Sequence, residues 1–212
     1  RYATQLIQRD LQTAGFRGCL RDLGTVINTL NDPTDFPNNY ARHVEGFEDV
    51  VSADLPAEIT AGGNEVVADT DVLVIRTVDD PNLQPTANMV TSSSDPVTVP
   101  GLDAAAPDTP AAGDIMLVTD CGGSAIFEVT DFDEGTGTIV HDAGAASPGN
   151  NSKNMVRRYS AGAQLFTLRT TTYFIRNNAA GIPGLWRRVA DGAPQELAEG
   201  VEDMQLMYGE DT

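Results

Sequence analysis

The stretch RYATQLIQRDLQTA, Arg1 to Ala14, predicts an amphipathic helix around which the rest of the chain is organised. Its apolar residues recur at spacings of three and four, so at 3.6 residues per turn they share one broad face. Gly15 follows and suits the left-handed conformation that ends many helices. The expected packing face of this helix consists of Tyr2, Leu6, Ile7, Leu11 and Ala14.

The start of this helix has no Ser, Asn or Asp cap, and the apolar pattern is already running at Tyr2. An isolated helix of this length is marginal in water. We therefore interpret residues 1–15 as the C-terminal half of a longer helix whose other half lies upstream. If Leu11 belongs to the core, its replacement by Ala costs about 2–5 kcal/mol.

Asp10 interrupts the apolar face, because it falls in angle between Leu6 and Ala14 on one side and Ile7 on the other. An unpaired charge buried in a core is very costly, so a buried Asp10 needs a partner. We expect that partner to be an Arg from the body of the domain or a backbone donor. Partial solvation of Asp10 at the edge of the face is the alternative.

The composition indicates a globular and strongly acidic protein. Hydrophobic residues make up 41% of the 212 residues, and 13 Lys and Arg stand against 31 Asp and Glu, a net charge of −18. Binding to nucleic acid or to an anionic membrane surface rests on clustered basic residues, so this charge disfavours both. The sequence shows no signal peptide and no apolar run near the ~18 residues of a membrane-spanning helix. Either a cytosolic protein or a trimmed chain would explain the absence of both segments, and the uncapped helix favours a trimmed chain.

Cys19 and Cys121 are the two cysteines of the chain. In the cytosol they would be two buried thiols. In an oxidising compartment they would be able to pair and close a long loop, worth up to about 4–5 kcal/mol. A zinc site needs more ligands at shorter spacing, and His43 and His141 do not supply them. The spacing by itself leaves the first two alternatives open.

The remainder of the chain predicts strands more than helices. Residue runs rich in β-branched and aromatic side chains predict strands at 71–78, 114–120, 125–132, 138–142, 163–175, 185–189 and 201–208. Residues 16–70 predict a long ordered connection with a turn of helix near 23–30, and residues 79–113 predict a solvated, mobile loop. One helix followed by antiparallel strands predicts an α+β class in which the sheet folds onto the helix.

The search for catalytic and metal motifs favours a protein that is not an enzyme and holds no cofactor or metal. The sequence has no G-x-S-x-G elbow, no P-loop, no G-x-G-x-x-G opening a helix and no H-E-x-x-H. Asp131, Asp133 and Glu134 resemble a piece of a calcium loop, but a solvated hairpin turn explains them better. Concentrated positive charge on an acidic chain predicts a docking face for an acidic partner, with local pairing to carboxylates as the alternative. The residues concerned are Arg157, Arg158, Arg187 and Arg188.

Three separated motifs together resemble the PilW family of minor type IV pilins. They are QRDLQTAGFRGC at 8–19, GDIMLVTDCGGSAIFEVT at 113–130, and a C-terminal block that contains TTTYFIRN, GIPGLWRRV and ELAEGVEDMQLMYGED. They occur in family order, and each cysteine lies inside one of them. The resemblance covers most of the chain in discontinuous blocks and is weakest at 20–70 and 79–113.

This resemblance implies a type IV pilin-like α+β fold, with an N-terminal helix packed on an antiparallel sheet. The expected domains are the half-helix at 1–15 and a single globular head at 16–212 with a mobile loop at 79–113. The resemblance also implies a subunit that helps prime pilus assembly at or near the tip, with roles in adhesion and twitching motility. A disulfide between Cys19 and Cys121 follows as an expectation, because the head would lie outside the cytoplasm.

The implied partners are other minor pilins and, in some systems, a tip adhesin, and the protein would have no small-molecule substrate. The missing N-terminal helix would anchor it in the inner membrane of a Gram-negative bacterium, facing the periplasm, before it joins the pilus at the cell surface. A pseudopilin of the type II secretion system is one alternative. A glycan-binding or adhesin module with Trp186 as a stacking platform is another.

Overall fold

The computed structural model describes residues 2–20, 26–61, 65–85, 89, 92–99, 101–102, 109–144 and 148–209. Within these residues the strands form two hydrogen-bonded sheets, one of eight strands and one of three. The chain also divides into two compact units, each built from separate stretches of sequence. Arg1, the first residue of the predicted helix, and residues 21–25 lie outside the described residues.

The predicted α+β pilin-like class is wrong. The structure is mostly β, with 12% of residues in helices and 35% in strands, and it has one helix of seven or more residues among those described. The N-terminal helix α1 is not packed on a sheet in pilin fashion. The underlying error was to expect the short N-terminal helix to dominate a fold whose buried residues lie mainly on strands.

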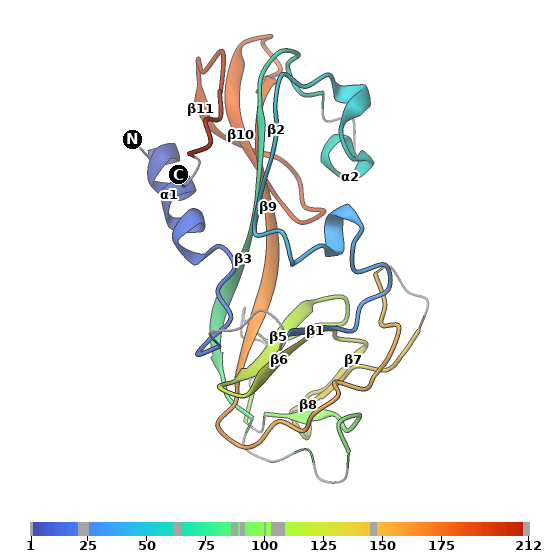
Figure 1. Cartoon of the computed structure of the whole chain (residues 1–212). Helices are drawn as coiled ribbons and strands as arrows, with labels where there is room; N and C mark the ends of the chain where they lie inside the picture. Colours follow the sequence, from blue (N-terminus) through green and yellow to red (C-terminus); the bar gives the residue numbers. More distant parts are fainter. Residues whose placement is uncertain are drawn as a thin grey trace. The chain divides into compact units, whose positions relative to one another are not determined.

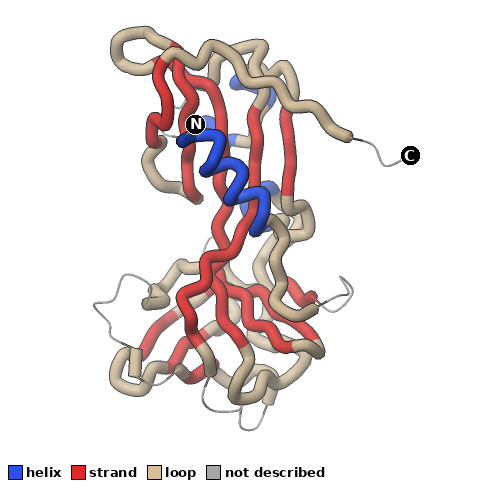
Figure 2. The backbone as a smooth tube through the Cα atoms, turned by 90° about the vertical axis from the view of Figure 1, so that its left-hand side faces the viewer, coloured by secondary structure: helices blue, strands red, loops and turns tan. Residues whose placement is uncertain are grey.

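The first unit consists of residues 1–15, 40–77 and 169–212. Its complete elements are α1 (Tyr2–Thr13), β2 (Val44–Phe47), η3 (Ser52–Asp54), α2 (Ala57–Thr60), β10 (Pro183–Val189) and β11 (Gln195–Glu199). Strand β3 (Val72–Leu83) contributes its first part to this unit and β9 (Gln164–Asn177) its last part. Figure 1 shows α1 and α2 on opposite sides of these strands, and Figure 2 shows α1 running in front of them.

Burial on both faces explains why strand β3 begins with the continuous apolar run Val72–Ile75. Val72 and Val74 point to one face and Leu73 and Ile75 to the other, and all four are less than 9% exposed. A strand covered on both faces cannot alternate apolar and polar residues, so DVLVIRTV is the strongest strand signal in the sequence. On the face that carries Leu73 and Ile75, the partners are Tyr173, the helix residues Ile7 and Ala14, and the C-terminal residues Met204 and Leu206.

The second unit consists of residues 16–39 and 78–168. It holds β1 (Val26–Asn28), η2 (Phe36–Asn38), β4 (Val97–Thr98), β5 (Ile115–Asp120), β6 (Gly123–Glu128), β7 (Asp131–Asp133) and β8 (Thr138–Val140), with the remaining parts of β3 and β9. Strands β5 and β6 form an antiparallel hairpin, and β1 pairs with β6 in parallel. Its core contains Met116, Phe127, Ile139, Met155 and Leu165, all completely buried.

Several predicted strands are present and others are not. The runs at 71–78, 114–120, 163–175 and 185–189 correspond to β3, β5, β9 and β10. The predicted meander is divided, because β8 pairs with β7 and β4 in the smaller sheet and not with β6. The helix expected near 23–30 is wrong over its described part, where β1 pairs residue by residue with β6.

Two more expectations fail for reasons of long-range contact. Residues 201–208 do not form a strand; Asp71 holds them instead, since its N–H donates to the Met204 carbonyl at 2.9 Å and its carboxylate accepts from the Leu206 N–H. Within 79–113, Leu83, Met89, Val97 and Val99 lie in the core of the second unit. The expected mobility of 79–113 and the boundary after residue 15 stay predictions.

Candidate functional site

The helix face that the sequence predicts for packing is only partly buried. Ala3 is buried against Ile175 and Leu185, with Ile7 packed against the same cluster. Ala14 packs against Leu73, Ile75 and Tyr173. Tyr2 and Leu11 are 65% and 43% exposed, so they are not part of the buried core, and their place on a packing face stays a prediction. At 100° per residue they lie on the two flanks of the buried stripe, and Leu6 is half-buried between stripe and solvent.

Asp10 lies on the buried stripe, and a tyrosine satisfies it. The Tyr173 hydroxyl donates to its carboxylate at 2.6 Å. The sequence predicted an Arg or a backbone donor, so the observed partner differs in type from the expected one. Burial first, and then the hydrogen bond and charge of Asp10, raise the pKa of Tyr173, so the phenol remains a proton donor at neutral pH.

Arg187 lies directly across the sheet from Tyr173, in the register that pairs β10 with β9. Its charge and hydrogen bonding lower the pKa of the Tyr173 phenol, against the larger effects of burial and Asp10. Its Nη2 donates to Gln195 Oε1 at 3.1 Å. Arg187 is half-buried and already engaged on the helix-bearing face, which limits its use as the predicted docking residue.

Arg188 points to the opposite face of β10 and has a structural role. It is 8% exposed. Its guanidinium donates to the carbonyls of Glu58, Ala61, Asp191 and Gly192 at 2.7–3.2 Å. Two of these carbonyls are at short helix α2 and two lie in the turn after β10, and a planar guanidinium with five donors suits such a site. These contacts and the burial of Arg188 leave little of it for the predicted docking role.

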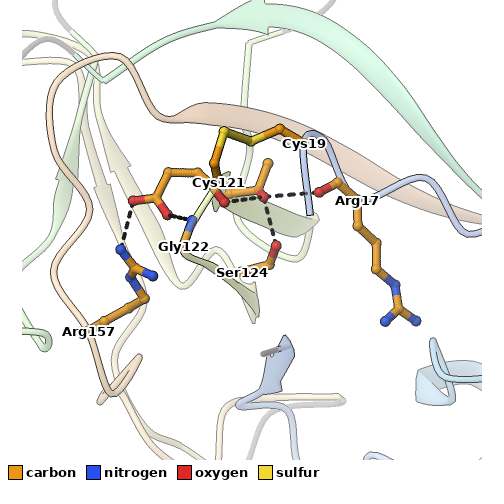
Figure 3. The surroundings of a disulfide bond; sticks show 8 residues. Arg17, Cys19, Cys121, Gly122, Ser124 and Arg157 are labelled. Atoms are coloured by element: carbon orange, nitrogen blue, oxygen red, sulfur yellow. Dashed lines mark hydrogen bonds and ion pairs between the residues drawn. A yellow bond between two sulfur atoms is a disulfide. The ribbon is translucent and has the colours of Figure 1, made fainter. Parts of the chain in front are cut away.

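The two cysteines form a disulfide in the second unit, the pairing expected from the family resemblance. It joins the segment after α1 to the β5–β6 turn, and both cysteines are exposed. Beside it, Thr119 Oγ1 donates to the Arg17 carbonyl at 3.1 Å and accepts from Ser124 Oγ at 2.7 Å. Figure 3 shows Arg17 and Arg157 on opposite sides of this disulfide.

Arg157 is fixed against the turn that carries Cys121. Its Nη2 donates to Asp120 Oδ2 at 3.0 Å, and its guanidinium lies 5.4 Å from the centre of the Tyr159 ring. A Cβ at Gly122 would be 2.5 Å from Nη1 of Arg157, so this position has to be glycine for the arginine to lie there. Arg158 is exposed. Arg157 and Arg158 belong to the second unit, and Arg187 and Arg188 belong to the first.

The described residues contain no group of three or more His, Cys, Asp or Glu side chains placed to hold a metal ion. At the calcium-like motif, Asp133 Oδ1 accepts from the N–H groups of Gly135 and Thr136, as in a polar turn. No helix of the described chain has the length and apolar character needed to cross a bilayer. That the protein lacks catalytic activity stays a prediction.

Trp186 is less available for ligand stacking than its sequence context suggested. The Arg176 guanidinium lies 5.0 Å from the centre of its ring, and its Nε1 donates to the Arg176 carbonyl at 2.9 Å. One ring face and the polar edge are therefore occupied within the chain.

Three residues with special geometry escaped the sequence reasoning. Val156 has a φ of +66°, which is rare for a β-branched residue, and no turn motif announces it. Gly46 makes room for Tyr208, whose hydroxyl would lie 1.6 Å from a Cβ at this position. Tyr173 was read only as part of a strand. Of the three, only Gly46 carried a signal in the sequence, because an isolated glycine within a strand often marks the close approach of another group.

The comparisons with known proteins concern the last part of the chain. No curated protein and no solved structure matches the chain. A family model described as Type IV Pilus-assembly protein W matches residues 172–212, which is less than half of the chain. The match covers the end of β9, strands β10 and β11, and the segment held by Asp71. It supports membership of the family of type IV pilus assembly proteins of the W type.

Proposed function

We propose that this chain is a minor pilin, a structural subunit of a type IV pilus that helps prime assembly and sits at or near the tip. The observation that carries the proposal is the match of residues 172–212 to the pilus-assembly W model. The matched residues supply the end of β9 and strands β10 and β11, which belong to the sheet that α1 contacts. They also supply Met204 and Leu206, which pack in the same unit. The match therefore falls on the unit that presents the N-terminal helix.

Helix α1 supports an assembly role through what it leaves uncovered. Tyr2 and Leu11 expose apolar surface on a helix that is otherwise tied to the sheet through Ala3 and the Asp10–Tyr173 hydrogen bond. In the proposed mechanism, this helix packs against helices of neighbouring pilins, and the sheets and loops present lateral surfaces. Such contacts are heterologous, so they propagate along a filament and do not close a ring.

The disulfide supports the proposed location. An exposed pair of cysteines remains oxidised outside the cytoplasm, as expected of a domain that faces the periplasm and then the cell surface. The proposed partners are other minor pilins and, in some systems, a tip adhesin. The proposal includes an inner-membrane anchor before assembly and no catalysis, cofactor or small-molecule substrate.

Deletion of the gene in its native host tests this function. We expect loss or strong reduction of surface pili, restored by the full-length gene, with secretion through a type II system unchanged. Normal piliation with defective secretion would replace the proposal by the pseudopilin alternative. Normal piliation and secretion would contradict both, and a glycan array that detects binding sensitive to Trp186→Ala would then favour the adhesin alternative.

A further inference from the structure

Residues 201–208, here called the strap, follow β11 in the first unit without forming a strand. Gly200 marks the bend between β11 and the strap, with a φ of +78°, and its N–H donates to the Pro183 carbonyl at 2.8 Å. Among the residues that the structure describes, two hydrogen bonds join the strap backbone to the rest of this unit, and both involve Asp71. The strap is therefore attached at one point and not along a strand ladder.

Asp71 is the attachment point of the strap and is 1% exposed. Its N–H donates to the Met204 carbonyl at 2.9 Å, and its carboxylate Oδ2 accepts from the Leu206 N–H. The other carboxylate oxygen, Oδ1, accepts from the Asp49 N–H at 2.9 Å, so the segment just after β2 holds the carboxylate in place. Because a buried carboxylate is costly without such donors, the strap and its attachment point stabilise each other.

The strap packs on a buried cluster to which helix α1 contributes. Ala3 of α1 forms this cluster with Ile175 and Leu185 of the sheet. Val201 and Met204 of the strap pack against it. The position of the N-terminal part of α1 and that of the strap are therefore linked through the same few buried side chains.

A second cluster of the same unit consists of Leu73, Ile75 and Tyr173. Met204 and Leu206 pack against it from the strap, and Ile7 and Ala14 pack against it from the helix. The helix and the strap thus share the covering of two buried clusters. Removal of either one would expose to water apolar surface that the other needs for its own packing.

Helix α1 has few other attachments. Ala3 is its one buried residue, and its one hydrogen bond to the described part of the sheet joins Asp10 to Tyr173 at 2.6 Å. Just after the helix, the Gly15 N–H donates to the Arg76 carbonyl at 3.2 Å. A helix of 12 residues is marginal in water without tertiary packing, so the loss of the strap would leave α1 weakly held.

We propose that the strap is a latch for α1, attached at Asp71, and that strap and helix open together as one cooperative unit while the sheet beneath them stays folded. Segments with few buried contacts open at free energies well below that of global unfolding. A partner for the helix face that carries Ala3, Ile7 and Ala14 would reach it only in the open state, so its binding would shift the latch toward opening. This inference does not depend on a role in pili.

Amide hydrogen exchange of the purified wild-type protein, resolved by residue with NMR at low urea concentrations, is the first test. We expect the helical amides of α1 and those of Asp71 and Leu206 to share one opening free energy and one urea dependence. The amides of β9, a strand with neighbours on both sides, should exchange at least about tenfold more slowly. Different urea dependences for helix and strap would show that they open separately and would overturn the proposal.

A pair of methionine substitutions in the strap tests the packing. Met204→Ala removes a side chain that packs on both clusters and is expected to speed exchange of the α1 amides at least about tenfold. Met207→Ala is the matched control, at a residue that is 96% exposed, and should leave exchange in α1 unchanged. Faster exchange at Leu206 without a change in α1 would contradict the latch. An equal acceleration in α1 and β9 would also contradict it, because the strap would then open only with the whole unit.

A pair of aspartate substitutions tests the attachment point. Asp71→Asn replaces one acceptor oxygen by an amide donor, and exchange at Leu206 and in α1 is expected to rise at least about tenfold. Asp69→Asn removes the same charge from an exposed side chain, and Asn tolerates the positive φ of this position, so exchange should stay as in wild type. Equal exchange in the two variants would show that Asp71 does not hold the strap.

The coupling must also run from the helix to the strap. Ile7→Ala weakens the packing of α1 on both clusters and is expected to speed exchange of the Asp71 and Leu206 amides at least about threefold. A strap that merely stabilises the sheet would not respond to this change. Unaltered exchange at Asp71 and Leu206, with faster exchange in α1, would overturn the proposal.

Discussion

The phenol of Tyr173 on β9 donates a 2.6 Å hydrogen bond to the carboxylate of Asp10 on α1, although the two residues are 163 positions apart. Tyr173 is completely buried, and Asp10 is half-buried on the stripe that faces the sheet. This bond fixes the rotation of a helix whose buried contacts are otherwise few and small, with Ala3 its one buried residue. It also allows a carboxylate to lie on an apolar face.

Tyr173→Phe is expected to lower the free energy of unfolding by about 1–2 kcal/mol, because it leaves the Asp10 carboxylate without this donor. Urea unfolding measures the change. Tyr2→Phe is the control, since the Tyr2 side chain is 65% exposed. A double-mutant cycle with Asp10→Asn should show coupling of at least about 0.5 kcal/mol. Additive effects would show that the bond does not contribute to stability.

Leu11→Ala is expected to cost less than about 1 kcal/mol, because the structure leaves Leu11 43% exposed. This replaces the 2–5 kcal/mol expected for a core leucine. Ile175→Ala, at a completely buried residue of the same unit, should cost about 2–5 kcal/mol. Thermal and urea unfolding of the two variants, measured side by side, test this. A larger loss of stability in Leu11→Ala than in Ile175→Ala would contradict the placement of Leu11 outside the core.

Arg188→Ala is expected to destabilise the protein by about 2–4 kcal/mol, since it removes the donors to four carbonyl groups. Arg188→Lys should recover less than half of this loss, because an ammonium cannot reproduce the planar guanidinium fork. Arg9→Ala, at an exposed position of α1, serves as the control for loss of positive charge. Stability of Arg188→Ala equal to that control would contradict the structural role.

Loss of the disulfide in the Cys19→Ser, Cys121→Ser double variant is expected to cost about 2–5 kcal/mol. Each single variant should lose a similar amount, because either removes the same link. Hydrogen exchange should increase first in the described parts of 16–39, which the link ties to the β5–β6 turn. Two reactive thiols in the unfolded, unreduced wild type would show that the pair is not bonded.

The stability of the second unit is expected to fall as the pH drops below the ordinary His pKa of about 6.5. Burial lowers the pKa of His141, which is 3% exposed and tilted against the Phe127 ring 5.2 Å away. Its Nε2 lies 3.0 Å from the Asp95 carbonyl, an acceptor, so this nitrogen carries the proton of the neutral ring. The unfolded chain binds a proton at a higher pH than the folded chain does, so stability is lost between the two pKa values.

Urea unfolding at about pH 7 and about pH 5.5 measures this effect, and His141→Gln is expected to reduce the loss between the two conditions. Asp142 and Lys153 act on His141 in opposite directions and are minor beside burial. An unchanged pH dependence in His141→Gln would assign the effect to carboxylates elsewhere in this acidic chain.

Much of the strand pattern was predictable because it is a local property. The β-branched run at 71–78 and the alternating run at 163–175 each became a long strand, and both cysteines lay inside recognisable motifs. The elements that failed depended on partners far away in the sequence. Three residues of β1 form a strand because β6 offers them a parallel edge, and 201–208 avoids a strand because Asp71 binds its backbone.

The sequence by itself determined where chain segments are apolar enough to be buried, that the surface is acidic, and which residues are chemically able to pair. Only the tertiary structure decided which neighbour each received. It assigned Asp10 to a tyrosine, Arg188 to carbonyl groups and Val156 to a strained, exposed turn. The physical reason is that side-chain periodicity fixes local conformation within a few residues, whereas a partner, a burial fraction or a positive φ depends on residues far away in the chain.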